Sequence, residues 1–457
     1  MAFQSINPAT GETLAVIDAW DEARLESALA LAARAAPCWA ATPVDQRCEH
    51  LRRVAGVLRS RQEALARLIT LEMGKLIREA RAEVEKCALA CDYYARHASD
   101  FLADEVIPSD AGRSYVAHQP LGTVLAVMPW NFPLWQVFRF AAPALAAGNT
   151  ALLKHASNVP QCAQAIETVF AEAGLPEGVF LSLMITSDQV AGVIADDRVR
   201  AVTLTGSEAA GRAVAACAGR HLKKTVLELG GSDPFIVLAD ADLEAAVATA
   251  LTSRFLNAGQ SCIAAKRFIL VPEVADAFLE RFRPAVEALR CGDPLDEATT
   301  LAPLARPDLR EELHRQVQAS IAAGASAVTG CSPHPGRGAF YLPSILDRVG
   351  PGMPAWEEEL FGPVAVLIRV ADEDEALAVA NGSRFGLGGS VWTRDLARGE
   401  ALARRIESGA VFVNGLVKSD PRLPFGGIKA SGYGRELSRH GLMEFVNQKT
   451  VWIGQDG

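Results

Sequence analysis

Short β-prone runs alternate with helical segments from about residue 120 onward, and this alternation constrains the possible folds more than any other feature of the sequence. A tight turn is enough to join antiparallel strands, whereas parallel strands need a long crossover connection, usually a helix. The repeated strand–helix order therefore predicts a parallel sheet with helices on both faces. Ligands in such sheets bind at the carboxyl ends of the strands.

The predicted elements form two blocks. The first block contains strands at Thr123–Met128, Thr150–Leu153, Ala201–Thr205 and Lys224–Leu229 and helices at Pro160–Ala173, Asp188–Ala195 and Glu208–Ala218. The second block, from Asp233 to about Glu407, contains strands at Phe235–Leu238, Phe268–Val271 and Val364–Val370 and helices at Asp240–Leu256, Glu273–Leu289, Asp308–Ala323 and Asp372–Ala380. Because 457 residues exceed the size of one hydrophobic core, we expect two or three domains.

Two long amphipathic helices precede these blocks, at about residues 45–68 and 77–94. Their polar faces are rich in arginine and glutamate and are predicted to be solvated. Cys87 and Cys91 lie on the apolar stripe of the second helix, so we interpret them as core residues rather than as metal ligands. Near the end of the chain, the β-prone segment 447–453 has no local partner and is expected to pair with another sheet, in this subunit or in a second one.

The composition excludes several classes of protein. The formal net charge is -9 and no basic block is present, which argues against a nucleic-acid-binding protein. No apolar run reaches the roughly 18 residues of a membrane span, and the first residues lack the pattern of a signal peptide. The 9 cysteines show no paired spacing, so we expect a reducing compartment, a cytoplasmic location and no metal site.

Cys262 ends the segment Asn257-Ala258-Gly259-Gln260-Ser261-Cys262 and is the candidate nucleophile. A thiolate attacks carbonyl carbon well, but a free cysteine has a pKa of about 8.5 and is only partly ionised at neutral pH. Its use in catalysis requires a base, and the oxyanion that forms requires hydrogen-bond donors. Glu228, beside the turn Gly230-Gly231, is a candidate base.

Asn131 lies in the loop Pro129–Pro133 directly after a predicted strand. Its immobilised amide is a candidate oxyanion donor, although a structural asparagine in a rigid turn explains the pentapeptide equally well. The segment 205–211 follows a strand and opens a helix, so its backbone N–H groups are placed to bind a phosphate. It lacks the full dinucleotide-binding glycine spacing, and by itself an ordinary turn is the better interpretation.

Three other segments permit a functional and a structural interpretation. Lys154 at a strand end could reach a ribose or phosphate, or could simply be solvated. Glu359 ends an acidic triplet before Phe361-Gly362, and such triplets bind a ribose diol less often than they face water. The glycine-rich loop at 424–436 could form a pocket mouth or a plain connector.

In this order and at these spacings, the segments resemble the aldehyde dehydrogenase superfamily over nearly the whole chain. The motifs that carry the resemblance are Pro129–Pro133, Glu228–Gly231, Gly259–Cys262, Glu359–Pro363 and Pro424–Gly427. The segments 131–139, 153–156 and 230–235 are most similar to bacterial NAD(P)-dependent succinate-semialdehyde dehydrogenases.

This resemblance implies a role for each candidate residue. Cys262 would attack the aldehyde carbon, while the Asn131 amide and the Cys262 backbone N–H hold the oxyanion. Loss of hydride to the nicotinamide would leave a thioester, which Glu228 hydrolyses by activating a water. The residues implied for binding NAD or NADP are Trp130, Lys154, Ser157, Gly206, Ser207, Gly211, Leu229, Glu359 and Phe361. Those implied for the substrate are Arg139, Trp135, Ser419 and Phe425.

Two positions bear on specificity. NAD-preferring relatives have an acidic residue where this chain has Ser157, and a neutral hydroxyl does not repel a 2′-phosphate, so we predict that NADP is accepted as well as NAD. Arg139 occupies the position of a carboxylate-binding arginine, and a guanidinium matches a carboxylate bidentately. The alternative is an arginine paired with a structural acid. A second substrate arginine of the relatives is replaced by Leu256, which leaves succinic semialdehyde, glutaric semialdehyde and other short ω-carboxy aldehydes as candidate substrates.

The resemblance also implies an α/β fold in three parts. A dinucleotide-binding domain with a parallel sheet, a Rossmann variant, would use residues 1–101 and 121–229, and an α/β catalytic domain would use residues 230–425. A small β oligomerisation element would combine residues 102–120 with the tail at 426–457, giving a homodimer or homotetramer. Three rival functions are a dehydrogenase that acylates coenzyme A, a cofactor-independent thiol hydrolase and a non-catalytic binding protein on the same fold.

Overall fold

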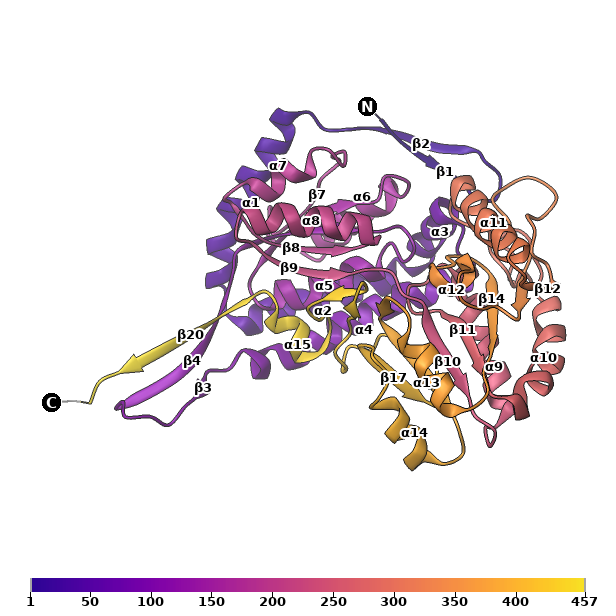
Figure 1. Ribbon diagram of the computed structural model, residues 1–457. Helices are drawn as coiled ribbons and strands as arrows, with labels where there is room; N and C mark the ends of the chain where they lie inside the picture. Colours follow the sequence, from indigo (N-terminus) through magenta and orange to yellow (C-terminus); the bar gives the residue numbers. More distant parts are fainter. Residues whose placement is uncertain (1, 456–457) are drawn as a thin grey trace.

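The computed structural model describes residues 2–455. Two α/β lobes lie side by side, and a narrow arm of strands, which includes the last strand of the described chain, projects away from them (Figure 1). Within residues 2–455, no helix is both long and apolar enough to cross a membrane.

The first lobe is built on a six-stranded sheet in the order β19-β9-β8-β5-β6-β7, in which only β19 is antiparallel to its neighbour. Its strands are β5 (Thr123–Met128), β6 (Thr150–His155), β7 (Phe180–Ser182), β8 (Val199–Thr205), β9 (Lys224–Glu228) and β19 (Gly432–Tyr433). Successive residues of a strand face opposite sides of a sheet, and on β5 Val124 and Ala126 enter one hydrophobic core while Leu125 enters another. The predicted parallel sheet with two buried faces is therefore confirmed.

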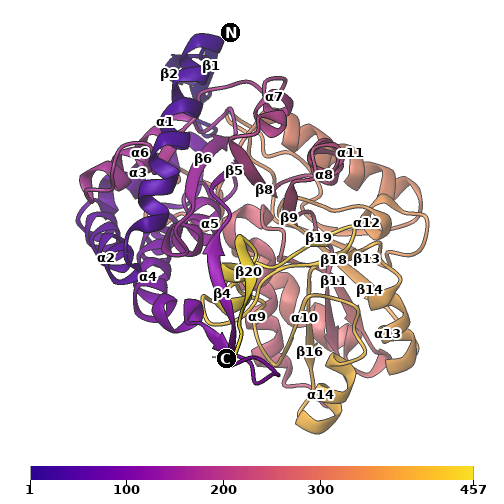
Figure 2. The ribbon, with the colours of Figure 1, turned by 90° about the vertical axis from the view of Figure 1, so that its left-hand side faces the viewer.

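Helices cover both faces of this sheet. The helices of the lobe are α1 (Glu22–Ala41), α2 (Val44–Ser60), α3 (Gln62–Met73), α4 (Ile77–Leu102), α5 (Trp135–Ala146), α6 (Pro160–Glu172), α7 (Val190–Ala195) and α8 (Glu208–Arg220). Helices α5 and α6 pack on one face with α2 to α4 outside them, and α1, α7 and α8 pack on the other. Figure 2 shows α2, α3 and α4 on the side of this lobe that lies away from the second lobe.

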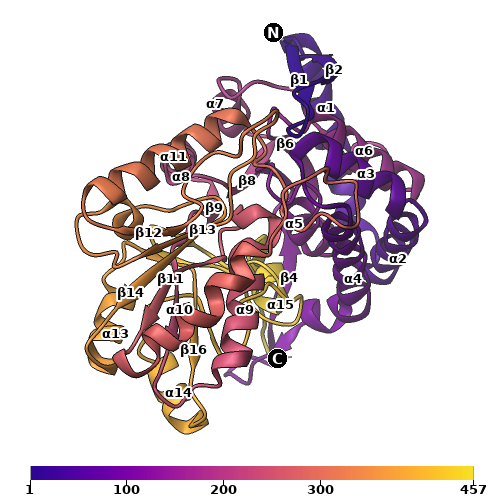
Figure 3. The same ribbon diagram turned by 90° about the vertical axis from the view of Figure 1, so that its right-hand side faces the viewer.

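The second lobe contains a seven-stranded sheet in the order β12-β13-β14-β11-β10-β16-β17, parallel except for β12. Its strands are β10 (Asp233–Val237), β11 (Ala265–Leu270), β12 (Ser326–Thr329), β13 (Ser344–Asp347), β14 (Val364–Arg369), β16 (Gly388–Trp392) and β17 (Ala410–Val413). Its helices are α9 (Leu243–Phe255), α10 (Pro272–Glu287), α11 (Pro307–Ala322), α12 (Pro354–Glu357), α13 (Glu373–Asn381) and α14 (Leu396–Ala403). Figure 3 shows α9 and α10 in front of this sheet.

The arm joins two segments that are distant in sequence. Strand β20 (Val446–Ile453) pairs antiparallel with β4 (Arg113–Pro120) along its whole length, and β4 also pairs with the short β3 (Glu105–Val106). The distant partner expected for the tail is thus a strand of the same chain. Two small pairs complete the sheets, β1 (Ala2–Ile6) with β2 (Thr13–Asp18) and β15 (Phe385–Gly386) with β18 (Ile428–Lys429), and the short helix α15 (Ser438–Met443) lies before β20.

Two helices, α1 and α5, were not predicted, and two others, α2 and α3, were predicted as one. Helix α1 was not predicted, because its alanine-rich sequence gives little apolar contrast and contains Pro37. The helix expected at 45–68 is interrupted at Arg61, so α2 and α3 are separate helices. Helix α5 was also not predicted, because every residue from Trp135 to Ala146 is buried and a helix that is apolar on all sides shows no periodic stripe.

Candidate active site

Two cavities meet at Cys262. The first, of about 100 Å³, is lined by the residues predicted for the substrate, Trp135, Arg139, Ser419 and Phe425. The second, of about 390 Å³, is lined by most residues predicted for the cofactor, namely Trp130, Gly206, Ser207, Leu229, Glu359 and Phe361, together with Asn131. Cys262 and Gln136 line both cavities. The fold thus brings together segments that are hundreds of residues apart in sequence.

A strained turn presents Cys262. Helix α9 ends at Phe255, and the next turn, the short 3₁₀ helix Leu256–Gly259, places Asn257, Ala258 and Gly259 at φ values of 55°, 52° and 74°. Non-glycine residues adopt this left-handed region only when their surroundings hold them there. The Asn257 backbone N–H donates to Glu79 at 3.0 Å, and its side-chain amide donates to the Asn131 carbonyl at 2.8 Å. These bonds connect the loop of the thiol to the loop of the predicted oxyanion donor.

Asn131 retains a free donor. Its Nδ2 donates to the carbonyl of Gln260 at 3.1 Å, and its backbone carbonyl accepts from Lys75 at 3.0 Å. Because a side-chain amide carries two N–H donors, one remains for a ligand. Within residues 2–455 the backbone N–H of Cys262 also has no acceptor. Each of these two groups therefore keeps an N–H without an acceptor among residues 2–455.

Glu228 ends strand β9 and is 2% exposed. Neither of its carboxylate oxygens has a hydrogen-bond partner among the described residues. Burial raises the pKa of Glu228 well above its ordinary value, and the neighbouring Glu436 raises it further, while Arg139 and Arg435 oppose the shift. A buried, unpaired carboxyl group with a raised pKa can take up a proton near neutral pH, as a general base must.

The thiol of Cys262 is also held in its protonated form. Burial raises its pKa, Arg139 and Lys266 oppose the shift, and the net result is a pKa of about 12. The Lys266 ammonium donates to the carbonyls of Ser261 and Cys262, at 2.9 Å each, and lies 3.1 Å from Glu359. In this arrangement the thiol needs a base before it can attack.

The cofactor-side cavity has aromatic, acidic and glycine components. Trp130 and Phe361 pack edge-to-face, with ring centroids 5.8 Å apart. Glu359 accepts from the Gly231 backbone N–H at 3.1 Å. Gly211, on α8, packs on Leu229, and a Cβ at Gly211 would lie 2.6 Å from that side chain. A larger residue at position 211 would therefore displace the Leu229 side chain.

Three other residues predicted for the cofactor lie near strand ends. The Ser207 hydroxyl caps α8 by accepting from the Ala210 backbone N–H at 3.3 Å. Lys154, at the end of β6, is 8% exposed, and burial lowers its pKa. Ser157 is exposed and lines a third cavity of about 620 Å³, which shares Arg306 with the cofactor-side cavity. Lys154 does not line the three cavities named here.

Arg139 forms an ion pair with Glu436, and both side chains are buried. Its Nη2 also donates to the Thr205 hydroxyl at 3.2 Å, and its guanidinium lies 4.5 Å from the ring centroid of Phe425. This arrangement matches the alternative interpretation of Arg139, in which the arginine is paired with a structural acid. Arg139 still lines the substrate-side cavity, and its contact with a substrate stays a prediction.

Sequence reasoning did not identify Glu436, Gln136, Lys266 or Lys86. Glu436 lies in the glycine-rich loop that was interpreted as a pocket mouth or a connector. Gln136 follows the noted loop but lies on the unpredicted helix α5. Lys86 lines the substrate-side cavity from α4, whose polar face was predicted to be solvated. Lys86 directly precedes Cys87, a residue of the buried stripe, and this position was a signal that Lys86 lies close to the interior.

Two cysteines were predicted to pack in the core rather than to bind a metal. Cys87 and Cys91 are fully buried in the core of the first lobe, as predicted. The described part of the chain holds no group of three or more His, Cys, Asp or Glu side chains placed to bind a metal ion.

Comparison with known proteins gives a consistent result. The pattern of the aldehyde dehydrogenase family matches residues 1–451. A probable NADP-dependent succinate-semialdehyde dehydrogenase of Synechocystis is 53% identical over 99% of this chain and 100% of its own. An NAD(P)-dependent succinate semialdehyde dehydrogenase of Escherichia coli is 51% identical over 98% of this chain and 97% of its own. The crystal structure of the Streptococcus pyogenes succinic semialdehyde dehydrogenase with NADP is 41% identical, with a TM-score of 0.97, over 99% of this chain and 100% of that one.

Proposed function

The chain belongs to the aldehyde dehydrogenase family, and from that premise we propose that it oxidises succinic semialdehyde to succinate with NADP or NAD. The reaction consumes one water and releases the reduced cofactor and two protons, one of them from ionisation of the new carboxyl group. Glutaric semialdehyde and other short ω-carboxy aldehydes are the alternative substrates within the same proposal.

The observation that carries this proposal is the position of Cys262 between two cavities. Cys262 lines both a small cavity and a larger one. Its thiol can therefore bond to the carbon of a substrate in the small cavity while that carbon faces a second ligand in the larger one. Such an arrangement suits a reaction that transfers hydride between two bound molecules. A hydrolase needs no second cavity of about 390 Å³ beside its nucleophile.

The residues around Cys262 support the following steps. Glu228 takes the thiol proton, and the Cys262 sulfur bonds to the aldehyde carbon. The Asn131 side-chain amide and the Cys262 backbone N–H stabilise the resulting oxyanion. The nicotinamide ring, when bound, supplies the acceptor for the hydride that leaves this carbon. Glu228 releases the thiol proton to solvent and then takes a proton from the water that hydrolyses the thioester on Cys262, which leaves as a thiolate and is reprotonated.

The cofactor-side cavity suits a dinucleotide. Its aromatic pair Trp130 and Phe361 offers apolar surface, and the carboxylate of Glu359 offers an acceptor for ribose hydroxyls. Gly206 and Ser207 begin α8, where backbone N–H groups favour phosphate. We assign Lys154 and Ser157 to the adenine ribose, and the neutral Ser157 permits NADP as well as NAD.

The test is the initial rate of NAD and of NADP reduction with succinic semialdehyde and, separately, with butanal. We expect reduction of both cofactors and a strong preference for the charged aldehyde. Equal rates with the two aldehydes would contradict the substrate assignment. No cofactor reduction with any aldehyde, together with thiol-dependent ester hydrolysis, would favour the cofactor-independent hydrolase instead. A requirement for coenzyme A would favour the acylating dehydrogenase, for which Glu228 has no evident use.

Assembly and location are part of the same proposal. The arm of β3, β4 and β20 exposes Val106, Ile107, Trp452 and Ile453, so a homodimer or homotetramer that covers these side chains is favoured. The nine cysteines are free, which fits a reducing compartment such as the cytoplasm. Sedimentation of the purified protein would distinguish a monomer from these assemblies.

A further inference from the structure

The cavity on the substrate side of Cys262 contains three cationic side chains, Lys86, Arg139 and Lys418. They do not have equal freedom to bind an anion. Arg139 is already paired with Glu436 in the interior, whereas Lys418 is exposed to solvent. Lys86 forms no ion pair with any of residues 2–455. It is therefore the partly buried cation of this cavity whose charge lacks a counterion.

Neighbouring side chains hold the Lys86 ammonium in place. Its Nζ donates to the Ser419 hydroxyl at 2.7 Å and lies 4.2 Å from the ring centroid of Trp135, a cation–π contact. Lys86 also lines a larger outer cavity of about 570 Å³. Trp135, Phe132 and Leu256 line both this outer cavity and the cavity at Cys262. Lys86 thus stands at the junction between the outer cavity and the thiol.

The Ser419 hydroxyl adds a second donor at the same place. Its oxygen accepts one hydrogen bond from Lys86 and another from the Trp135 indole N–H at 3.1 Å. A serine hydroxyl has two acceptor positions and one donor. Because both acceptor positions are occupied, the O–H of Ser419 is left to donate. An ammonium and a hydroxyl donor side by side form a site that matches a carboxylate.

We propose that Lys86 is a specificity-determining residue whose ammonium, together with the Ser419 hydroxyl, binds the distal carboxylate of the aldehyde. This inference rests on the proposed function, because it assigns a residue to the carboxylate that distinguishes the substrate class. Arg139 then contributes through its buried pair with Glu436, which supports the cavity wall and Glu228. The cavity at Cys262 limits the chain length between the carboxylate and the aldehyde carbon.

The electrostatics around Lys86 agree with a role in binding an anion. Burial and, to a smaller extent, Arg139 lower the pKa of Lys86, while Cys87, Glu83 and Asp420 raise it, and the net result is a pKa of about 8. A partly buried ammonium without a counterion is costly. A bound carboxylate would stabilise the ammonium and so raise the pKa of Lys86 toward its ordinary value. The same electrostatic attraction would tighten binding of the carboxylate.

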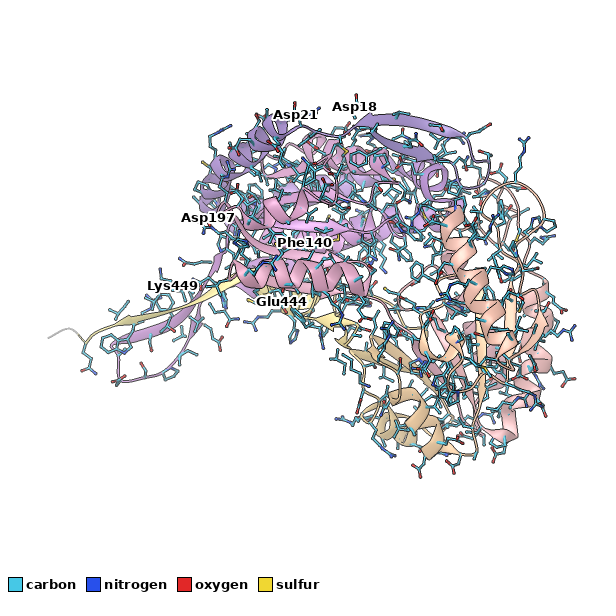
Figure 4. All side chains as sticks on the ribbon, turned by 45° about the horizontal axis from the view of Figure 1, so that its top comes forward. Asp18, Asp21, Phe140, Asp197, Glu444 and Lys449 are labelled. Atoms are coloured by element: carbon cyan, nitrogen blue, oxygen red, sulfur yellow. The ribbon has the colours of Figure 1, made fainter. Side chains whose placement is uncertain are left out.

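The test compares succinic semialdehyde with butanal in the full-length Lys86→Gln variant, whose amide keeps a donor for Ser419 but has no charge. We expect the ratio of kcat/KM for succinic semialdehyde to kcat/KM for butanal to fall by about tenfold to a hundredfold, the usual range for losing a charged hydrogen bond. Lys449→Gln removes one charge from the projecting arm (Figure 4) and should leave the ratio unchanged. Equal losses for both aldehydes in Lys86→Gln would overturn the proposal, as would a loss of the ratio in Lys418→Gln with Lys86→Gln unaffected.

A second measurement needs no variant and decides the matter if Lys86→Gln does not fold. In the wild-type enzyme, KM for succinic semialdehyde should rise above about pH 8, where Lys86 loses its proton, while KM for butanal stays level. A constant ratio of the two KM values between neutral pH and pH well above 8 would overturn the role of Lys86. A wild-type enzyme without preference for the charged aldehyde would instead contradict the proposed substrate, so the two failures are distinguishable.

Discussion

The guanidinium of Arg139 and the carboxylate of Glu436 form an ion pair whose side chains are only 2% and 3% exposed. Glu436 is held there by two backbone hydrogen bonds of 2.7 Å to Phe425, on whose ring Arg139 also packs. The pair lies next to Glu228, and its Glu436 member raises the pKa of the Glu228 carboxyl group. A structural ion pair is thus part of the environment of the predicted base.

Breaking this pair should destabilise the protein. Glu436→Gln leaves a buried unpaired guanidinium, and Arg139→Leu leaves a buried unpaired carboxylate, so each should lower the free energy of unfolding by about 3–5 kcal/mol. The double variant should lose clearly less than the sum. Urea denaturation measures all three, and Arg404→Gln, which breaks an exposed pair with Glu400, should cost at most about 1 kcal/mol. Strictly additive losses would show that the two side chains do not act as a pair.

Removing the nucleophile should separate binding from chemistry. Cys262→Ala should abolish aldehyde oxidation and leave NADP binding intact, because the thiol forms the bond to substrate while the cofactor-side cavity keeps its other walls. The absorbance of the reduced cofactor and the quenching of tryptophan fluorescence by NADP report the two properties. Cys38→Ala, at an exposed cysteine, is the matched control. Residual turnover in Cys262→Ala would exclude the thiol mechanism.

Replacing the predicted base should stop the reaction after one cycle. Glu228→Gln should form the thioester more slowly, because Cys262 has lost its base, and should then stall after at most about one reduced cofactor per active site, because the thioester is not hydrolysed. In the wild type, burial and Glu436 raise the pKa of Glu228, and only the deprotonated carboxylate can accept a proton. Turnover should therefore fall as pH drops below this raised pKa and recover as pH rises through it. Rapid-mixing kinetics across pH tests both points, and steady turnover in Glu228→Gln would count against this role.

Gly211 should be required for cofactor binding. In Gly211→Ala the new Cβ would come within 2.6 Å of the Leu229 side chain, which lines the cofactor-side cavity and would have to move. We expect a loss of about 1–3 kcal/mol in stability, typical of overpacking, and a higher KM for NADP. Gly219→Ala, on the same helix with open space around its Cβ position, is the control and should do neither. Equal KM values in the two variants would contradict this account.

Ser157 should decide whether NADP is tolerated. Ser157→Glu places a negative charge where we expect the adenine ribose, so it should reduce kcat/KM for NADP by about tenfold or more while preserving that for NAD. Ser157→Gln, of similar size but neutral, is the matched control and should retain activity with NADP. Steady-state kinetics with both cofactors makes the comparison. A parallel loss with NAD and NADP would mean that position 157 does not face the 2′-phosphate.

Local sequence patterns predicted some elements of the fold and not others. Strand β5 was predicted with its observed limits, because a run of apolar residues between turn signals is a local property. Helix α5 was not, since all of its side chains are buried and no stripe marks it. The same difference applies at the site: Cys262 and Asn131 stand out by their motifs, whereas Glu436 has meaning only next to Arg139, far away in the sequence.

Residue types at short spacings were enough to predict the strand–helix alternation, the thiol, the amide and the carboxylate, and through the ordered motifs the family. They did not show that Arg139 is paired with an internal acid, or that Lys86, on a helix face predicted to be solvated, reaches Ser419 instead. Helix α4 packs against α5, which brings these groups together around one cavity. The charge that a buried side chain can offer to a ligand depends on its neighbours in space, and those neighbours are set by packing between distant segments.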